Sequence, residues 1–252
     1  MSIFSLSFFG AFAVAGITSM TAAYDRGDVD EASRQGVLAG PAVVEKALDA
    51  PVRGTQLAAI SAAPYVEARP ELLPALAELA SNPDRRTAIP AALAARAIAR
   101  ELAHRDLPDD IASDDVMRWR ALFDQIAQAE PRFIEVRVLA LDTVSSLAQT
   151  LVSTSIGFDL AGALDDPDPA FRAAAVALVP RPTPAPLRAP LADAIQNDAD
   201  TTVALAAAQA LCGDGRDPAL GLLGARGLAR VKKLVAGKPL HVTRDARKCL
   251  VR

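Results

Sequence analysis

The chain has 252 residues, of which 51% are hydrophobic and only 4% are aromatic. Most of the apolar residues are Ala, Leu and Val. This favours closely packed helices over a β-sandwich, because Ala and Leu form helices readily and sandwiches use more aromatic and β-branched residues. The formal net charge of −3 excludes the overall basic excess that is typical of nucleic-acid-binding proteins.

Residues 1–23 carry no charged side chain and contain an apolar run from Phe4 to Ile17. Such a run, followed by small residues, is typical of a secretory signal peptide, and cleavage after Ala23 would leave a mature chain that begins at Tyr24. The segment has no Lys or Arg before the run, so an uncleaved membrane anchor and a buried N-terminal helix stay open as alternatives. Export to the periplasm or the extracellular space is the working hypothesis, and a membrane-anchored protein is the alternative. Residues 24–40 are expected to form a polar entry segment.

A repeat extends over residues 41–212. A turn rich in Asp, Asn or Pro precedes a run of Ala, Leu, Ile and Val in five segments, at 48–60, 81–93, 129–141, 165–178 and 197–211. Turn residues of these kinds compete with the helix for backbone hydrogen bonds, so they mark where a helix begins. Another helical pattern precedes each segment, at 41–50, 71–80, 114–128, 156–164 and 187–196. The sequence therefore predicts five helix pairs.

The five segments can be aligned at one position, which is occupied by Arg53, Arg86, Arg137, Arg172 and Ala204. Four residues earlier stand Asp49, Asn82, Phe133, Asp168 and Asp200. Asp and Asn are preferred N-cap residues, because their side chains accept hydrogen bonds from the free N–H groups at the start of a helix. We therefore expect Asp168 to cap the helix that carries Arg172, and Arg172 to reach a carbonyl or carboxylate of a neighbouring repeat.

The segment DDPDPAFRAAAVAL at 165–178 resembles a HEAT repeat, especially the short HEAT-like repeats of bacteria. The resemblance implies an all-α fold, a right-handed α-solenoid of the armadillo/HEAT type with about five helix pairs, whose second helices line a concave face. It also implies that Asp and Arg side chains hydrogen-bond along the stack. In this resemblance the ladder is formed by Asp49, Arg53, Asn82, Arg86, Arg137, Asp168 and Arg172.

Residues 213–252 are expected to form a C-terminal cap helix at 217–235 and a basic tail. This region carries a net charge of +7, against −10 for the rest of the chain. Arg226, Arg230 and Lys233 lie on one face of the predicted helix. That face is a candidate site for an acidic partner or for membrane headgroups; the alternative is a solvated face on a terminal cap.

The two cysteines, Cys212 and Cys249, are predicted to form a disulfide bond. An exported chain with an even number of cysteines usually pairs them, because its compartment is oxidising. The bond would enclose the cap helix and hold the tail against the last repeat. The alternative is two unrelated thiols, one buried and one exposed.

Motifs for chemistry are sparse in this sequence. It has no HExxH, CxxC or glycine-rich phosphate loop, and its two histidines are far apart. The acidic cluster at 165–168 is interpreted as a helix-capping turn rather than a metal site. Trp119 shares an apolar stripe with Val116 and Phe123. This favours a core residue over the exposed, base-contacting Trp of HEAT-fold DNA glycosylases.

The expected function is that of a non-enzymatic scaffold that binds a protein partner along its concave surface, because a solenoid offers a long curved surface and no enclosed pocket. No cofactor, metal, nucleic acid or small-molecule substrate is expected. One alternative is a HEAT-like enzyme of the bilin-lyase or DNA-glycosylase type. Another is a membrane-tethered assembly factor that retains residues 3–23 as an anchor.

Overall fold

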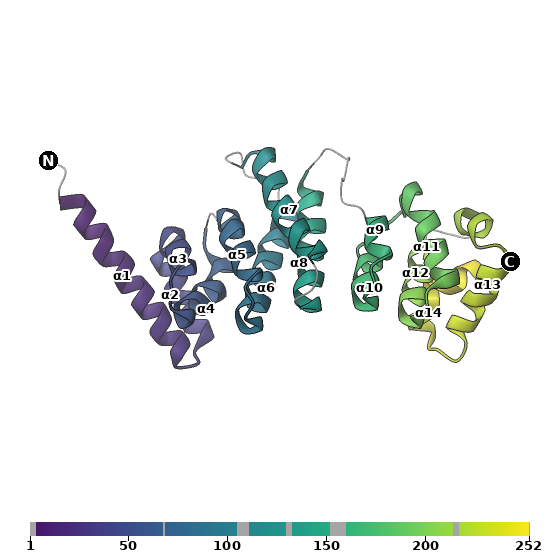
Figure 1. The fold of residues 1–252 in the computed structure, drawn as a ribbon, viewed down its shortest axis with the longest axis horizontal. Coiled ribbons are helices and arrows are strands. Elements are labelled where there is room, and N and C mark those ends of the chain that lie inside the picture. Colours follow the sequence, from purple (N-terminus) through teal and green to yellow (C-terminus); the bar gives the residue numbers. More distant parts are fainter. Residues whose placement is uncertain are drawn as a thin grey trace. The chain divides into compact units, whose positions relative to one another are not determined.

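The computed structural model describes residues 4–67, 69–104, 111–129, 133–151, 160–213 and 217–251. Within these ranges all regular structure is helical and there is no β-strand, as the composition predicts (Figure 1). The chain divides into two compact units, Met1–Thr154 and Ser155–Arg252. Among the described residues, no helix combines the length and the apolar character that a membrane span requires.

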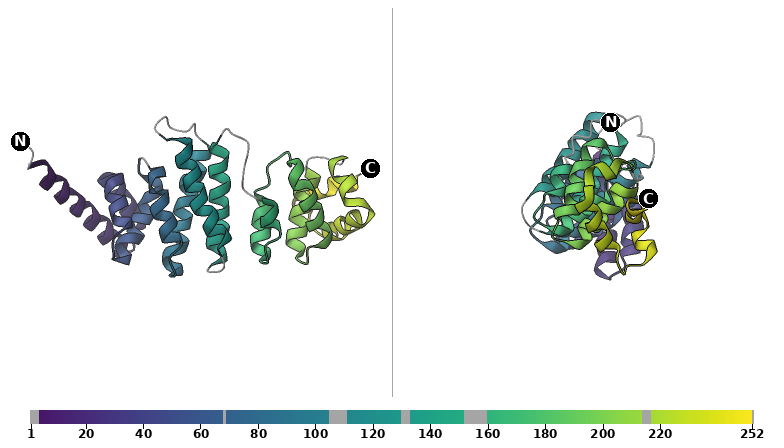
Figure 2. Two further views of the ribbon diagram at one scale, coloured as in Figure 1. Left: turned by 45° about the horizontal axis from the view of Figure 1, so that its top comes forward. Right: turned by 90° about the vertical axis from the view of Figure 1, so that its right-hand side faces the viewer.

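The N-terminal unit consists of helices stacked in pairs. Its α-helices are α1 (Phe4–Asp25), α2 (Val29–Ala39), α3 (Pro41–Leu48), α4 (Arg53–Ala62), α5 (Leu73–Ala80), α6 (Arg85–Ala103), α7 (Ser113–Gln128) and α8 (Ile134–Thr150), with 3-10 turns η1 (Ala63–Tyr65) and η2 (Arg69–Leu72). The pairs are α3 with α4, α5 with α6, and α7 with α8. First helices contact first helices, and second helices contact second helices, from each pair to the next (Figures 1 and 2).

The C-terminal unit repeats this two-layer packing. Its helices are α9 (Leu160–Leu164), α10 (Pro169–Ala177), α11 (Ala185–Asn197), α12 (Thr201–Gly213), α13 (Asp217–Val235), α14 (Leu240–Arg247) and the 3-10 turn η3 (Lys248–Leu250). Helices α9, α11 and α13 contact one another in order, as do α10, α12 and α14. The predicted cap helix at 217–235 is two helices joined at Gly224, whose φ of 54° is favourable for glycine. The start of the helix predicted at 156–164 lies outside the described residues.

The N-terminal helix is part of the fold. Helix α1 packs against α2, α3 and α4, and its Met20 and Ala23 side chains are fully buried. A cleaved signal peptide is expected to make few contacts with the mature fold, whereas cleavage after Ala23 would remove Met20 from this core. Of the three interpretations of the segment, a buried N-terminal helix fits these contacts.

Residues 24–40 form more than a polar entry segment. Helix α2 begins at Val29 because the Asp28 carboxylate accepts a hydrogen bond of 2.9 Å from the Glu31 N–H. Its inward face presents Ala32 and Gly36, four residues apart and both buried. The expectation missed this helix because so short a stripe of small residues gives a weak apolar pattern.

Small residues let α1, α2 and α4 approach closely. A Cβ atom added to Gly36 would lie 2.3 Å from the Cβ of Ala62, and one added to Gly16 would lie 2.7 Å from the Cβ of Ala39. Both distances are shorter than any normal carbon–carbon contact. The position of α1 against α2, and of α2 against α4, therefore depends on these two glycines.

Three of the interhelical turns share one hydrogen-bonding pattern. The first residue of the pattern accepts from the N–H two positions later, and the residue at that later position caps the next helix. In the turn before α10, Asp166 accepts from the Asp168 N–H at 2.9 Å and Asp168 accepts from the Ala170 N–H at 2.8 Å. The predicted capping role of Asp168 is confirmed. The other two turns use Asn82 with Asp84, and Asp198 with Asp200.

This pattern corrects the sequence alignment at the first two repeats. The N-cap of α6 is Asp84, not Asn82, and Asp49 ends α3 while Val52 precedes α4. The equivalent N-cap positions are Val52, Asp84, Phe133, Asp168 and Asp200. The alignment by composition failed for two reasons: the turn before α6 offers both Asn82 and Asp84, and the turn before α4 has no side-chain cap at its N-cap position, Val52.

The arginines of the proposed ladder make different contacts. Arg172 forms a two-pronged ion pair with Asp198 in the next turn, with Nε–Oδ2 and Nη2–Oδ1 distances of 2.8 Å. Arg53 lies 3.1 Å from the Asp84 carboxylate of the next turn. Arg137 donates to the carbonyl of Ala127 in its own pair. Arg86 is exposed, and its side chain makes no hydrogen bond or ion pair with another described residue. Arg53 and Arg172 therefore connect successive pairs, whereas Arg86 does not.

The Arg172–Asp198 pair shifts the pKa of both members. Burial raises the pKa of the Asp198 carboxyl, but hydrogen bonds from Arg172 and from the Asp200 N–H outweigh it, so this pKa lies below its ordinary value. The hydrogen bond with Asp198 raises the pKa of Arg172. The folded C-terminal unit is therefore stabilised by the ionised form of Asp198.

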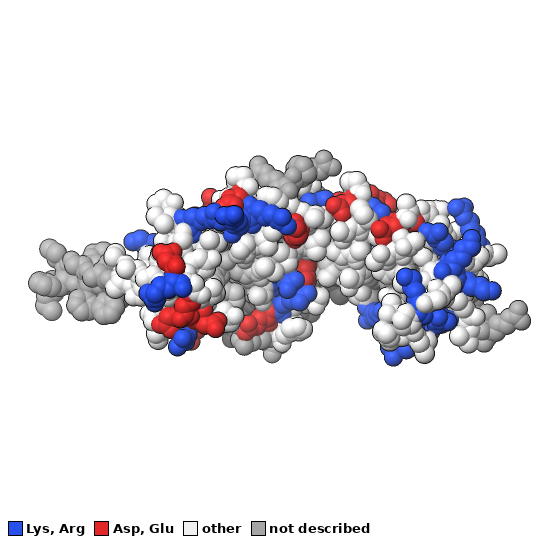
Figure 3. All heavy atoms as spheres, turned by 90° about the horizontal axis from the view of Figure 1, so that it is seen from below, with Lys and Arg blue, Asp and Glu red and all other residues white. Residues whose placement is uncertain are grey.

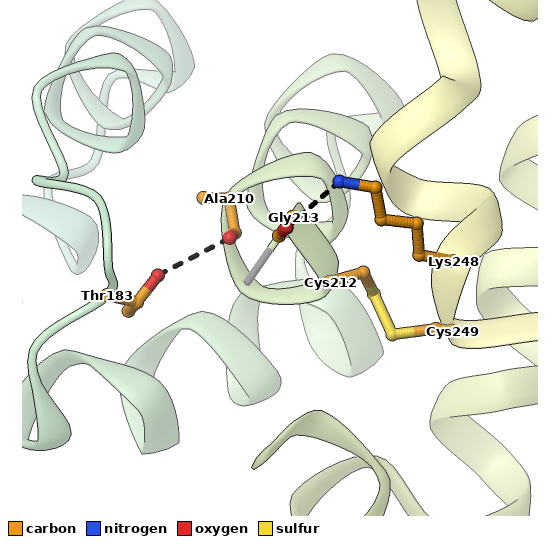
Figure 4. The surroundings of a disulfide bond; sticks show 6 residues. All are labelled: Thr183, Ala210, Cys212, Gly213, Lys248 and Cys249. Atoms are coloured by element: carbon orange, nitrogen blue, oxygen red, sulfur yellow. Dashed lines mark hydrogen bonds between the residues drawn. A yellow bond between two sulfur atoms is a disulfide. The ribbon is translucent and has the colours of Figure 1, made fainter. Parts of the chain in front are cut away.

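A disulfide bond closes the C-terminal unit. Cys212 at the end of α12 is bonded to Cys249 in η3, with a Cα–Cα distance of 5.4 Å (Figure 4). The predicted pairing is confirmed, and the alternative of two separate thiols is wrong. Beside the bond, the Lys248 ammonium donates to the carbonyl of Gly213 at 3.0 Å. The basic tail contains the helix α14.

Replacing Gly36 with Ala tests the close approach of α2 and α4. Ala normally stabilises the interior of a helix by about 1 kcal/mol relative to Gly. Here the added Cβ collides with Ala62, so we expect a destabilisation of about 1–3 kcal/mol, measured by urea unfolding. The matched control is Gly221→Ala, where an added Cβ meets nothing within 4 Å and no loss is expected. If Gly36→Ala raised the free energy of unfolding as much as Gly221→Ala does, the close contact of α2 with α4 would be contradicted.

Replacing Arg172 with Met tests the ion pair. The Asp198 side chain is only 6% exposed, so loss of its partner is expected to cost about 3 kcal/mol at pH 7. Because the folded pKa of Asp198 is lowered, the contribution is present above the ordinary carboxyl pKa and is lost as the pH falls through the folded value. The difference between variant and wild type should therefore shrink as the pH is lowered below the ordinary Asp pKa of about 3.9, in urea unfolding followed by circular dichroism. Arg86→Met is the control, and its free energy of unfolding should stay within about 0.5 kcal/mol of the wild type. If the loss of stability in Arg172→Met did not change with pH, the stabilising role of the ion pair with Asp198 would be refuted.

Candidate functional site

An apolar groove opens on the N-terminal unit, between α2 on one side and the end of α4 with η1 on the other. Its volume is about 740 Å³, and it is lined by Val29, Asp30, Ser33, Arg34, Val37, Leu38, Ser61 and Tyr65. We call this surface the α2–η1 groove. Four of the apolar side chains are unusually exposed: Leu38 at 80%, Tyr65 at 66%, Val29 at 47% and Val37 at 44%.

The groove follows from the way in which α2 is packed. Its inward stripe carries the small residues that contact α1 and α4, so the larger residues Val29, Ser33 and Val37, spaced by four, lie on another stripe. The Ser33 hydroxyl lies 2.9 Å from the carbonyl of Val29 and 3.0 Å from that of Ser61. Because this hydroxyl joins the two walls, the groove is a fixed feature of the unit.

The start of α2, which forms one end of the groove, carries exposed carboxylates. Asp30 lines the groove, and Asp28 lies two residues before it. The guanidinium of Arg34, which also lines the groove, is already paired with Glu31 at 2.9 Å. Asp and Glu side chains also gather near the N-terminal end of the face shown in Figure 3. The groove therefore combines apolar walls with carboxylates at one end.

A second hollow, of about 310 Å³, lies in the C-terminal unit between the turns before α10 and α12. It is polar, but Asp166 accepts hydrogen bonds within its own turn, and Asp198 binds both its turn and Arg172. Within the described ranges, no group of three or more His, Cys, Asp or Glu is placed to hold a metal ion. The contacts of Asp166 and Asp168 fit the capping interpretation of the cluster.

The candidate binding residues of the cap helix take part in packing. Arg226 donates to the side-chain oxygen of Asn197 at 3.1 Å, and Arg230 donates to the carbonyl of Asp198 at 3.2 Å. Lys233 is exposed. Arg226 and Arg230 thus hold α13 against the turn between α11 and α12, and the three residues do not form one free cationic face.

Trp119 is a core residue. It is 7% exposed, and Val116 and Phe123 of the same stripe are fully buried. The sequence-based interpretation is confirmed, and this side chain is not available to stack on a nucleic-acid base.

No family model matches the chain, and no curated protein is similar to it in sequence. The α2–η1 groove is therefore the feature from which a function has to be inferred.

Sequence reasoning missed this groove. Val29, Ser33 and Val37 do repeat at helical spacing, which is the available signal. However, the sequence does not show which apolar stripe of α2 is covered by α1 and which is left open. That depends on tertiary packing.

Proposed function

We propose that this chain is a non-enzymatic scaffold, a right-handed HEAT-like α-solenoid, that binds a protein partner. The contacts of first helices with first helices and of second helices with second helices, in each unit, support a solenoid. By the resemblance to HEAT repeats, we expect the partner to bind along the surface that the second helices line. Helix α4 is the second helix of its pair and supplies Ser61 to the α2–η1 groove, so the groove borders that surface.

The observation that carries the proposal is the exposure of Leu38 and Tyr65 in one groove. Monomeric soluble proteins rarely leave several large apolar side chains open to solvent at one place, and such patches are typical of interaction sites. Aromatic and aliphatic anchors surrounded by a polar rim are also the usual anatomy of a protein interface. We expect a partner to insert apolar side chains between Leu38 and Tyr65.

The contacts favour this proposal over the enzymatic alternatives. The charged residues that line the groove are Asp30 and Arg34, and the Ser33 hydroxyl between them is hydrogen-bonded to backbone carbonyls rather than to a base. A glycosylase of the HEAT type would need an exposed Trp, whereas Trp119 is buried. A membrane-tethered factor stays as an alternative, although the buried Met20 ties part of α1 to the fold.

Replacing Leu38 with Glu tests the groove. The side chain is 80% exposed, so the stability of the variant should stay within about 0.5 kcal/mol of the wild type. A charge among the apolar anchors should weaken partner binding by about tenfold or more. The measurement is crosslinking and affinity capture from the native source. Met117→Glu is the matched control, because Met117 is 48% exposed on α7 of the same unit. If the wild type, Leu38→Glu and Met117→Glu all captured the same partners, the proposal would be overturned.

We further propose that the protein is exported to the periplasm or the extracellular space. The support is the Cys212–Cys249 bond, since structural disulfides persist in oxidising compartments and are rare in the cytosol. The contacts of α1 support a mature protein that retains at least the part of this helix that contains Met20.

The intact mass of the protein, purified from its native source under alkylating conditions, tests both points. We expect no alkylated cysteine and an N-terminus that precedes Gly16. The C-terminal unit should lose about 3–4 kcal/mol of stability when the bond is reduced, from the 37-residue separation of the cysteines. Two alkylated cysteines in the native protein would contradict export, and an N-terminus at Tyr24 would contradict retention of α1.

A further inference from the structure

The C-terminal unit carries a surface that complements the groove. On α14, Leu240 is 65% exposed, and Arg244 and Lys248 follow at intervals of four residues with side chains 78% and 45% exposed. The three therefore lie along one face of the helix and the turn after it. Val251, beyond the disulfide, is 64% exposed. We call this the α14 face.

The α14 face has an excess of positive charge. Its carboxylate, Asp245, is 15% exposed and already binds Arg181 at 3.0 Å and Lys248 at 2.9 Å; the hydrogen bonds from these cations lower the pKa of its carboxyl. Arg244 lies 3.7 Å from the same carboxylate, so one half-buried carboxylate faces three cations. Figure 3 shows Lys and Arg gathered over the C-terminal helices with few carboxylates among them.

We propose that the α2–η1 groove of one copy of this chain binds the α14 face of a second copy. This inference rests on the proposed function and names the partner. The groove has apolar walls and, at the start of α2, the exposed carboxylates of Asp28 and Asp30. The α14 face has an exposed Leu240 and the cation of Arg244. Leu240 inserts between Leu38 and Tyr65, and Arg244 meets the carboxylates at the start of α2.

The contact joins two different surfaces, so it is heterologous. Once the contact has formed, one copy keeps an unused α14 face and the other keeps an unused groove, so association continues head to tail unless the geometry closes a ring. The charge distribution also favours head-to-tail contact, because the net charge of the residues before Gly213 is −10 and that of the remaining residues is +7. Opposite charges at the two surfaces favour this orientation over groove to groove.

Two variants that each destroy one half of the contact provide the test. Leu38→Glu disrupts the groove and keeps the α14 face, whereas Leu240→Glu disrupts the α14 face and keeps the groove. Each is studied by sedimentation velocity from about 1 μM to about 200 μM, a range that detects micromolar affinity, alone and in an equimolar mixture. Met117→Glu is the control, and it should associate like the wild type.

The wild type is expected to form dimers and longer species as its concentration rises, and each variant alone should stay monomeric. The mixture should form a dimer and nothing larger, because only one complementary pair of surfaces is left. Raising the salt concentration from about 0.05 M to about 0.5 M should weaken association about tenfold, because it screens exposed charges.

A wild type that stays monomeric throughout, a mixture that stays monomeric, or a single variant that still associates would each overturn the proposal. Anionic vesicles added to the wild type distinguish the membrane alternative: binding that is lost in Leu240→Glu, without self-association, would assign the α14 face to lipid. If the wild type is monomeric but a different protein is captured through Leu38, the inference fails and the proposed function stands. If the wild type is monomeric and no protein is captured through Leu38, the inference and the proposed function both fail.

Discussion

Close contact between helices with small side chains is the constraint on which the rest of this structure depends. Alanine is abundant in the buried core, and Gly36 meets Ala62 at a distance that leaves no room for a Cβ atom. Helices of this kind pack without many aromatic residues, because their backbones approach closely. The same contact directs the small stripe of α2 inward and leaves Val29 and Val37 on the open side. The α2–η1 groove is thus a consequence of the packing of α1 and α2.

The turns set how one helix pair meets the next. In three of them, a pair of Asx side chains accepts backbone N–H bonds and starts the second helix at a defined residue. Arg172 then binds the corresponding turn of the following pair through Asp198, and Arg230 binds that turn from the other side. Stability in the C-terminal unit is therefore concentrated at a few polar contacts, in addition to its apolar core. Arg226 and Arg230 belong to this set, which explains why they do not form a free binding face.

Much of the fold could be predicted from the sequence, because helical periodicity and polar turns are local signals. The helix pairs and the cap at Asp168 were accessible in this way. The contact of Arg172 with a neighbouring turn came from the aligned repeats, and the Cys212–Cys249 bond from the even number of cysteines and the expected compartment. The start of α6 was misplaced because Asn82 and Asp84 compete in one turn, and that of α4 because Val52, at its N-cap position, makes no side-chain cap. The groove was not either: exposure of Leu38 depends on which neighbour covers α2, and that neighbour, α1, has the composition of a signal peptide.

Hydrogen–deuterium exchange of the whole chain at a low and a high protein concentration tests most directly whether the α2–η1 groove binds the α14 face of a second copy. Amides of α2 and η1, together with those of α14, are expected to exchange more slowly at the high concentration, while those of α7 are unchanged. Both surfaces should become protected together, because each is covered by the other in the neighbouring copy. Unchanged exchange in α2 and η1, or protection confined to other helices, would contradict the contact between the groove and the α14 face.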